Sequence, residues 1–289
     1  MKNLRIAFFG TPELAVYVLD ELEKGGIVPA LVVTAPDRKA GRKLVLTPPA
    51  VKEWALERDV EVLQTESLKS GVEEIEILEN SEWDLFIVAA YNIFLPKYLL
   101  ELPQYGVLNV HPSLLPKLRG PSPVRSEIRD DLEDEVGISI IELDEEMDHG
   151  PIVAQATVEL PEWPVNGRAL DELLFREGGR LLLEVVPEWV KKTITPDPQE
   201  HEEATFTQRT VKSDGEISLD DDAYTNYCKY CAHDEWPGTF FFYECNDAKV
   251  RLKVTDATLE DGNFVIHKVI PEGKKEMLFE DWKRGCEAN

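Results

Sequence analysis

Short apolar segments alternate with amphipathic ones along the first two thirds of the chain, and this alternation constrains the fold more than any other feature. The runs Leu4–Gly10 and Asp84–Ala90 are almost wholly apolar, which is typical of strands buried on both faces of a parallel sheet. Apolar residues recur with helical spacing over Pro12–Lys24, and two glycines follow. We therefore predict a doubly wound parallel sheet with right-handed crossovers.

The same patterns predict the remaining elements of this region. Strands are expected over 27–35, 60–64, 106–111, 136–144 and 151–160, and helices over 49–58, 73–80, 96–101 and 168–192. Pro187 is expected to bend or interrupt the last helix.

The composition changes after the long helix. Residues 195–204 are rich in proline and acid without an apolar period, which predicts a linker or a surface crossing. Residues 205–289 mix one helix with short strands and predict a small, β-rich, barrel-like domain. The expected organisation is a first domain over 1–194, a linker over 195–204 and a second domain over 205–289.

The net charge of −25 makes the chain strongly acidic. This charge repels polyanions and excludes broad nonspecific binding to nucleic acid, although a local basic patch could still make specific contacts. The N-terminal segment predicts a buried strand rather than a signal peptide, and no window is long enough to cross a bilayer. We expect a cytoplasmic protein.

The four cysteines lie in the C-terminal third. Cys228 and Cys231 have a C-x-x-C spacing with His233 close behind, and a zinc site would need a second pair from Cys245, Cys286 or His267. The segment around the first pair reads as a helix, on which the two thiols would share one face. Since nothing marks the chain as secreted, we expect neither a metal nor a disulfide.

The first loop, Gly10–Glu13, follows a predicted strand and opens a helix. A dinucleotide-binding protein would carry G-x-G-x-x-G there, but only one glycine is present. NAD-type binding is therefore not expected, and the loop instead shapes a tight turn with proline at the first helical position.

Candidate catalytic residues lie at the end of the strand over 106–111. Asn109 and His111 are two residues apart, so both side chains point to the same face, at the carboxyl end where open α/β sheets bind ligands. Asp148 precedes a His-Gly-Pro turn, from which a carboxylate can reach a strand-end histidine and stabilise its protonated form. His111 alone would as readily be a structural residue.

These residues resemble the folate-dependent formyltransferases, which carry an Asn-x-His pair, an S-L-L-P loop and a later Asp-x-Gly. The chain has Asn109 and His111, Ser113–Pro116, and Asp148 with Gly150, in that order. The resemblance implies a formyltransferase-type Rossmann-like fold, with Asn109, His111 and Asp148 as the catalytic groups. It implies 10-formyltetrahydrofolate as the co-substrate, with no metal, bound by Phe86, Val88, Ala90, Tyr91, Asn92, Ser113, Leu114, Leu115 and Pro116.

Within that family the chain is most similar to members that formylate methionyl initiator tRNA. The likeness lies in the opening FFGTPELAVYVLDEL, in Pro36–Ala55 and in the C-terminal segments, and it implies a tRNA-contacting loop with Arg38, Lys39, Arg42 and Lys43. Those four cations form a basic island that can contact phosphates. The alternatives are a formyltransferase for a nucleotide-linked amino sugar and a noncatalytic folate- or RNA-binding protein. We expect a monomer.

Overall fold

The buried aliphatic and aromatic runs of the sequence form the strands of a seven-stranded sheet. The computed structural model describes residues 4–41, 44–245 and 248–287. They divide into two units, the first comprising residues up to 119, 137–158 and 171–206, and the second comprising 120–136, 159–170 and 207 onward. Each unit has its own sheet and its own apolar core.

The sheet of the first unit confirms the predicted α/β architecture. Its strands run in the order β5-β2-β1-β6-β7-β8-β9. The pairs from β5 to β7 are parallel, whereas β8 and β9 are antiparallel to their neighbours. The bounds are β1 Ile6–Phe9, β2 Leu31–Thr34, β5 Glu61–Gln64, β6 Leu85–Ala89, β7 Val107–His111, β8 Gly137–Glu142 and β9 Ile152–Thr157.

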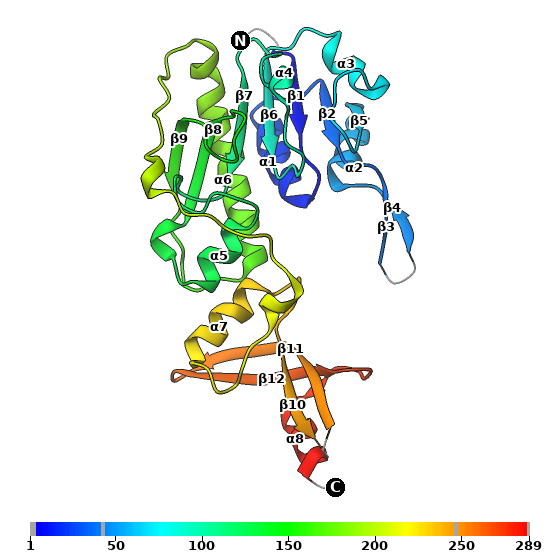
Figure 1. Cartoon of the computed structure of the whole chain (residues 1–289), viewed down its shortest axis with the longest axis vertical. Helices are drawn as coiled ribbons and strands as arrows, with labels where there is room; N and C mark the ends of the chain where they lie inside the picture. The colour runs from blue at the N-terminus through cyan, green and yellow to red at the C-terminus, as the bar shows by residue number, and fades with distance from the viewer. Residues whose placement is uncertain (1–3, 42–43, 246–247, 288–289) are drawn as a thin grey trace. The chain divides into compact units, whose positions relative to one another are not determined.

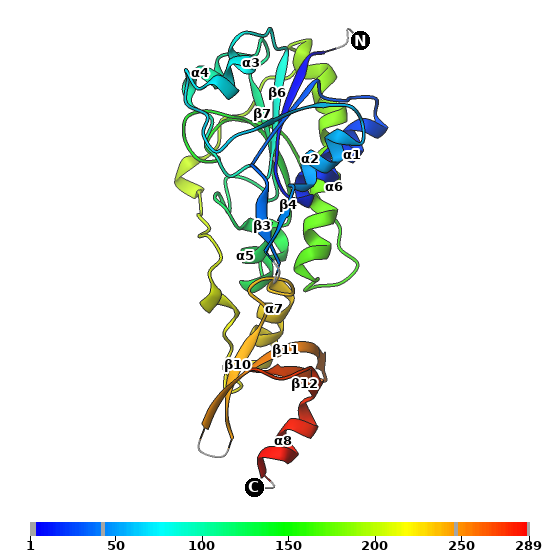
Figure 2. The same cartoon turned by 90° about the vertical axis from the view of Figure 1, so that its right-hand side faces the viewer.

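Helices cover both faces of this sheet (Figure 2). On one face, Gly178 brings the long helix close to Val110 of β7 and Ile138 of β8. On the other face, Ile75 and Leu99 pack into one core cluster with residues of β1, β6 and β7. The first layer contains α1 (Glu13–Lys24), α2 (Ala50–Leu56) and α6 (Gly167–Val190), and the second contains η1 (Glu73–Ile75), α3 (Glu76–Glu79) and α4 (Lys97–Leu100).

Two details of the first unit differ from the expectations. The long helix continues through Pro187 to Val190, because the proline falls in its last turn. The segment expected to be a basic loop contains a β-hairpin, with β3 (Arg38–Ala40) antiparallel to β4 (Val45–Thr47). The hairpin projects from the edge of the first unit (Figure 1).

The second unit confirms the β-rich character predicted for the C-terminal part. Its four strands form one antiparallel sheet in the order β10-β11-β12-β13, over a core that includes Phe241, Leu252 and Trp282. It also contains α5, a helix that the sequence patterns did not predict. The bounds are α5 Pro123–Arg129, η2 Glu133–Glu135, η4 Lys212–Gly215, α7 Ala223–Ala232, β10 Phe240–Cys245, β11 Ala248–Glu260, β12 Asn263–Pro271, β13 Met277–Leu278 and α8 Phe279–Glu287.

The two pairs of cysteines differ in bonding: one pair is free and the other forms a disulfide. Cys228 and Cys231 are free and buried on α7, as expected for two thiols on one helical face. The expectation of no disulfide is wrong for the other pair, since Cys245 at the end of β10 is bonded to Cys286 of α8. Their Cα atoms lie 5.1 Å apart although 41 positions separate them in the sequence, a proximity that only the packing of α8 creates.

No helix in the described ranges is long and apolar enough to cross a membrane.

Candidate active site

Asn109 and His111 lie at the carboxyl end of β7, as the sequence predicted. In the sheet register, Asn109 is opposite Val88 of β6 and His111 is opposite Ser139 of β8. Paired residues share a face, so the two side chains point to the same side as Val88 and Ser139. Both are buried, with 9% and 4% of their surfaces exposed.

Asp148 is brought to His111 across 37 positions of sequence. The Nδ1 atom of His111 lies 3.6 Å from Oδ1 of Asp148, within ion-pair range but longer than a hydrogen bond. The other ring nitrogen, Nε2, lies 3.1 Å from the carbonyl oxygen of Leu118. A carbonyl can only accept, so Nε2 carries a proton and Nδ1 is the nitrogen that faces the carboxylate.

The turn that carries Asp148 has an unusual backbone. Asp148 has φ +50°, in the left-handed region that a side chain makes costly, by roughly 1–2 kcal/mol. Gly150 is required two residues later, because a Cβ there would lie 1.8 Å from the carbonyl oxygen of Glu142. The Asp-x-Gly spacing is thus a consequence of the path of this turn against β8.

Asn109 differs from His111 in that its side-chain amide is available to donate a hydrogen bond. Within the described ranges its side-chain amide has no hydrogen-bond partner. It adjoins a histidine whose Nε2 is already bonded to Leu118. An amide N–H held in a buried site can donate to a substrate oxygen without first breaking a protein contact.

The loop Ser113–Pro116 is held by two residues that the sequence analysis missed. Ser139 of β8 accepts a hydrogen bond from the Leu115 amide at 3.1 Å and donates to the Ser113 carbonyl at 2.6 Å. Gln155 of β9 donates to the Leu115 carbonyl and to the Ser139 hydroxyl, both at 2.8 Å. A serine and a glutamine at alternating positions of otherwise apolar strands were the available signal.

The residues assigned to folate fall into two groups. Phe86 and Val88 are buried in the core cluster, where Phe86 contacts Phe9 and Trp83 at ring separations of 5.1 and 5.8 Å. Tyr91 lies beyond β6, and its buried hydroxyl has no hydrogen-bond partner in the described structure. Burial raises the pKa of this phenol. The remaining members are partly exposed Ala90 and Leu114, exposed Asn92, buried Ser113 and Leu115, and half-buried Pro116.

The segment expected to be a linker or a surface crossing is packed against the turn that carries Asp148. Gln199, only 5% exposed, donates from Nε2 to the carbonyl oxygens of Asp148 at 2.9 Å and Gly150 at 2.6 Å. Its Oε1 atom accepts from Nε and Nη2 of Arg119 at 3.0 and 2.6 Å. Burial lowers the pKa of Arg119, and the nearby carboxylates of Asp148 and Asp144 oppose that shift.

Two histidines extend this network. Nη2 of Arg119 donates to Nδ1 of His201 at 2.9 Å, and the His201 ring stacks on His149 at 4.1 Å with an interplanar angle of 1°. His149 in turn donates from Nδ1 to Asp144 at 2.6 Å. The order along the chain gave no sign that residues 199–201 would lie beside residues 144–150.

The basic residues assigned to tRNA are only partly described. Arg38 and Lys39 lie on β3, and the Arg38 side chain is 74% exposed, with Glu66 3.9 Å away. Arg42 and Lys43 lie outside the described residues. The hairpin also exposes Leu44, Val45 and Leu46, each more than half accessible to solvent.

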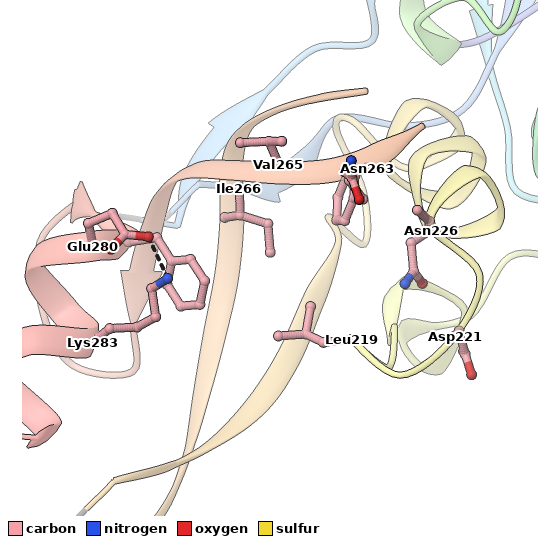
Figure 3. A pocket seen from close by; sticks show the side chains of 11 residues that line it. Leu219, Asp221, Asn226, Asn263, Val265, Ile266, Glu280 and Lys283 are labelled. Atoms are coloured by element: carbon pink, nitrogen blue, oxygen red, sulfur yellow. Dashed lines mark ion pairs between the residues drawn. The ribbon is translucent and has the colours of Figure 1, made fainter. Parts of the chain in front are cut away.

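A separate cavity of about 400 Å³ lies within the second unit and contains none of the predicted site residues. Apolar side chains of β12 and α8, among them Ile266 and Phe279, line it together with Asn226 and the Glu280–Lys283 ion pair (Figure 3). In the part of the chain that the structure describes, no group of three or more His, Cys, Asp or Glu side chains could hold a metal ion.

An open α/β sheet with an amide donor and a histidine at a strand's carboxyl end, and an aspartate beside the histidine, has the architecture of an α/β enzyme whose ligands bind at that edge of the sheet. Residues 4–185 match the family model described as formyl transferase. A methionyl-tRNA formyltransferase of Chloroflexus aggregans is 44% identical over 90% of this chain and 84% of its own length. One from Herpetosiphon aurantiacus is 36% identical over 98% of both chains. The chain therefore belongs to the formyltransferase family, in its methionyl-tRNA formyltransferase branch.

Solved structures agree on the fold. A methionyl-tRNA formyltransferase from Clostridium thermocellum superposes with a TM-score of 0.58 at 18% identity, over 95% of this chain and 99% of that one. An N-formyltransferase from Helicobacter canadensis, in complex with folinic acid and dTDP-3-aminofucose, gives 0.63 at 15% identity over 89% of both chains. At these identities the likeness concerns the fold.

Proposed function

We propose that this chain transfers the formyl group of 10-formyltetrahydrofolate to the α-amine of methionyl initiator tRNA. The observation that carries the proposal is the placement of Asn109 and His111 on one face of β7, with Asp148 3.6 Å from His111, in a chain whose relatives of 35–44% identity are methionyl-tRNA formyltransferases. The folate supplies the activated formyl group. Direct transfer needs no nucleophilic side chain, and we assign none.

Asn109 is assigned to the formyl oxygen. As the amine attacks the formyl carbon, a carbon–nitrogen bond forms and negative charge develops on that oxygen. The unpartnered amide of Asn109 can donate to it, and such a donor is typically worth about 10²–10³ in rate. His111 is assigned as a second, charged donor through its Nδ1–H, since its Nε2–H already donates to the Leu118 carbonyl.

Asp148 is assigned to proton movement and to the charge of His111. The bond from the formyl carbon to the folate nitrogen breaks while the attacking amine loses a proton, so one proton must pass from the amine to the departing nitrogen. A carboxylate 3.6 Å from Nδ1 of His111 can orient the ring, stabilise its positive charge and relay this proton through water.

The folate pocket is assigned to the strand ends on either side of Asn109. Phe86 and Val88 form its buried base, Ala90, Tyr91 and Asn92 follow β6, and Ser113–Pro116 follow β7. The unpartnered Tyr91 hydroxyl supports this assignment, since a buried polar atom without a partner is expected to meet a ligand or water. A pterin has both the flat apolar faces and the polar edge that such a pocket suits.

The tRNA is assigned to the β3–β4 hairpin. Arg38 and Lys39 lie on β3, and Arg42 and Lys43 follow them in the sequence, in a chain whose net charge is −25. Phosphate contacts by such residues fix the position of a nucleic acid. The acidic remainder repels it, so binding depends on this local patch.

The remaining assignments of the proposal concern domain organisation, oligomeric state, metal and location. Residues 1–194 form the catalytic domain, 195–204 the linker and 205–289 a C-terminal domain that assists tRNA binding. The enzyme acts as a monomer, with no metal, in the cytoplasm where aminoacylated tRNA is used.

Transfer of labelled formyl from 10-formyltetrahydrofolate to charged initiator tRNA tests the proposal. It should be run at low and near-molar salt with Arg42→Ala, with Lys39→Ala and with Lys69→Ala, an exposed lysine outside the hairpin, as the control. We expect efficient transfer that weakens in the two hairpin variants and leaves the control unchanged. Each lost phosphate contact should reduce the slope of log affinity against log salt by about 1. Transfer only to a nucleotide-linked amino sugar would replace the tRNA assignment.

A further inference from the structure

We infer that the segment after α6, residues 195–206 and here called the connecting segment, positions the catalytic His111–Asp148 pair through two residues, Gln199 and Thr205. The inference rests on the proposed function and assigns positioning roles to residues that do not touch the reacting atoms. All the contacts that carry it lie within the first unit.

Gln199 acts on the aspartate side of the pair. Its Nε2 donates to the carbonyl oxygens on both sides of His149, those of Asp148 and Gly150. Asp148 has a positive φ, a conformation that persists only where the surroundings determine it. Two hydrogen bonds from one buried side-chain amide supply that constraint. Arg119 completes it by holding Oε1 of Gln199, which fixes the orientation of the amide.

Thr205 acts on the histidine side of the pair. Its Oγ1 accepts the hydrogen bond of the Leu118 amide at 2.8 Å, and its carbonyl accepts that of Arg119 at 2.9 Å. Leu118 also has a positive φ, of +59°, and its carbonyl oxygen is the acceptor for Nε2 of His111. Thr205 therefore fixes the backbone of Leu118, and the carbonyl oxygen of Leu118 fixes the orientation of the His111 imidazole.

The contacts of Gln199 and of Thr205 both come from the connecting segment, and each holds one member of the catalytic pair. Both members of the catalytic pair depend on a residue with left-handed backbone, and the connecting segment holds each of those residues. The segment is itself fixed by reciprocal backbone hydrogen bonds between Asp197 and Ile152 of β9, both 2.8 Å long. A displacement near 1 Å in such a pair can cost about 100-fold in rate, so small constraints far from the reacting atoms matter.

Gln199→Glu and Thr205→Val test the inference. The first keeps an acceptor for Arg119 and removes both amide donors, whereas the second replaces the hydroxyl by a methyl group of equal size. We expect kcat to fall about 10- to 100-fold in each, because a small displacement of the pair lowers the rate steeply, with KM for both substrates nearly unchanged. Glu202→Gln, an exposed change in the same segment, is the matched control and should leave kcat unaltered.

A double-mutant cycle separates positioning from a general structural role. In an Asp148→Asn background, Gln199→Glu should have little further effect on kcat, because it acts through Asp148. An equal loss in both backgrounds, or a rise in KM alone, would overturn the inference. Should Gln199→Glu fail to fold, Thr205→Val in a His111→Asn background makes the same test on the histidine side.

A spectroscopic measurement separates this inference from the proposed function. The ring ¹⁵N resonances of His111 should shift in Gln199→Glu and Thr205→Val but not in Glu202→Gln. A parent enzyme that transfers no formyl group while these shifts occur would refute the proposed function and leave the positioning intact. If the parent enzyme transfers formyl but the His111 resonances are the same in both variants as in the parent, the positioning alone would be refuted.

Discussion

Nε2 of His111 and the carbonyl oxygen of Leu118 are 3.1 Å apart, and this contact decides which nitrogen of the ring is available. The carbonyl fixes a proton on Nε2 and turns Nδ1 towards Asp148. Leu118 and His111 are seven positions apart, so the sequence that ends β7 also supplies the acceptor that orients its histidine. The imidazole is therefore held in one fixed orientation.

Removing the side-chain amide of Asn109 should slow the chemical step of formyl transfer. We expect Asn109→Ala to lower kcat by about 10²–10³, with KM nearly unchanged, because the lost donor stabilises charge that develops only in the transition state. Steady-state formyl transfer measures this effect. Asn80→Ala, an exposed asparagine at the end of α3, is the control. Equal kcat in Asn109→Ala and the control would contradict the oxyanion role.

Replacing Gly150 should displace the catalytic turn. Its Cβ would meet the Glu142 carbonyl oxygen at 1.8 Å, so in Gly150→Ala the backbone must move and carry Asp148 with it. We expect a lower melting temperature and a loss of kcat comparable to that of Asp148→Asn. Gly285→Ala is the matched control, since its Cβ meets open space on α8, where alanine should stabilise the helix by about 0.5–1 kcal/mol. A normal kcat in Gly150→Ala would show that the turn position is unimportant.

His233 should make the second unit sensitive to acid. Its ring is 1% exposed, and both nitrogens lack a hydrogen-bond partner in the described structure. Burial, reinforced by the positive charge of Arg125, lowers its pKa from 6.5 to about 4. Between these two values the unfolded chain binds a proton that the folded chain does not. Stability is therefore unaffected above pH 6.5 and falls, by up to about 1.4 kcal/mol per pH unit, as the pH drops towards 4.

Denaturant unfolding of the parent and of His233→Leu over this pH range measures the effect. Carboxylates titrate in both proteins, so the informative quantity is the difference in free energy of unfolding between them. We expect that difference to change in favour of the variant as the pH falls. A difference independent of pH would show that His233 does not carry the acid sensitivity.

Reduction of the Cys245–Cys286 bond should destabilise the second unit. The bond closes a loop of 41 residues, and its chain-entropy contribution is about 4 kcal/mol. We expect a reductant to lower the denaturant midpoint of the parent by a corresponding amount. A Cys245→Ser, Cys286→Ser double variant should show the lower midpoint with or without reductant. If reductant does not change the denaturant midpoint of the parent, the packing of α8 against β10 stabilises the second unit without help from the disulfide.

The elements of the sheet and the face of β7 that Asn109 and His111 share could be predicted from local sequence. Strands buried on both faces are apolar throughout, and residues two apart on a strand share a face, so Asn109 and His111 could be paired without a structure. The short helix α5 and the β3–β4 hairpin were missed, since neither has a strong apolar period.

Other parts of the site were decided by tertiary structure. Gln199 holds Asp148 across 51 positions, Thr205 holds Leu118 across 87, and Cys245 meets Cys286 across 41. Local propensity and periodicity fix which residues form a strand and which face they occupy. Local propensity and periodicity do not predict which distant backbone carbonyl a side-chain amide will bind, because that contact depends on how the whole chain packs. The sequence determined the fold class and the shared face of Asn109 and His111, and the packing of the connecting segment determined how His111 and Asp148 are held.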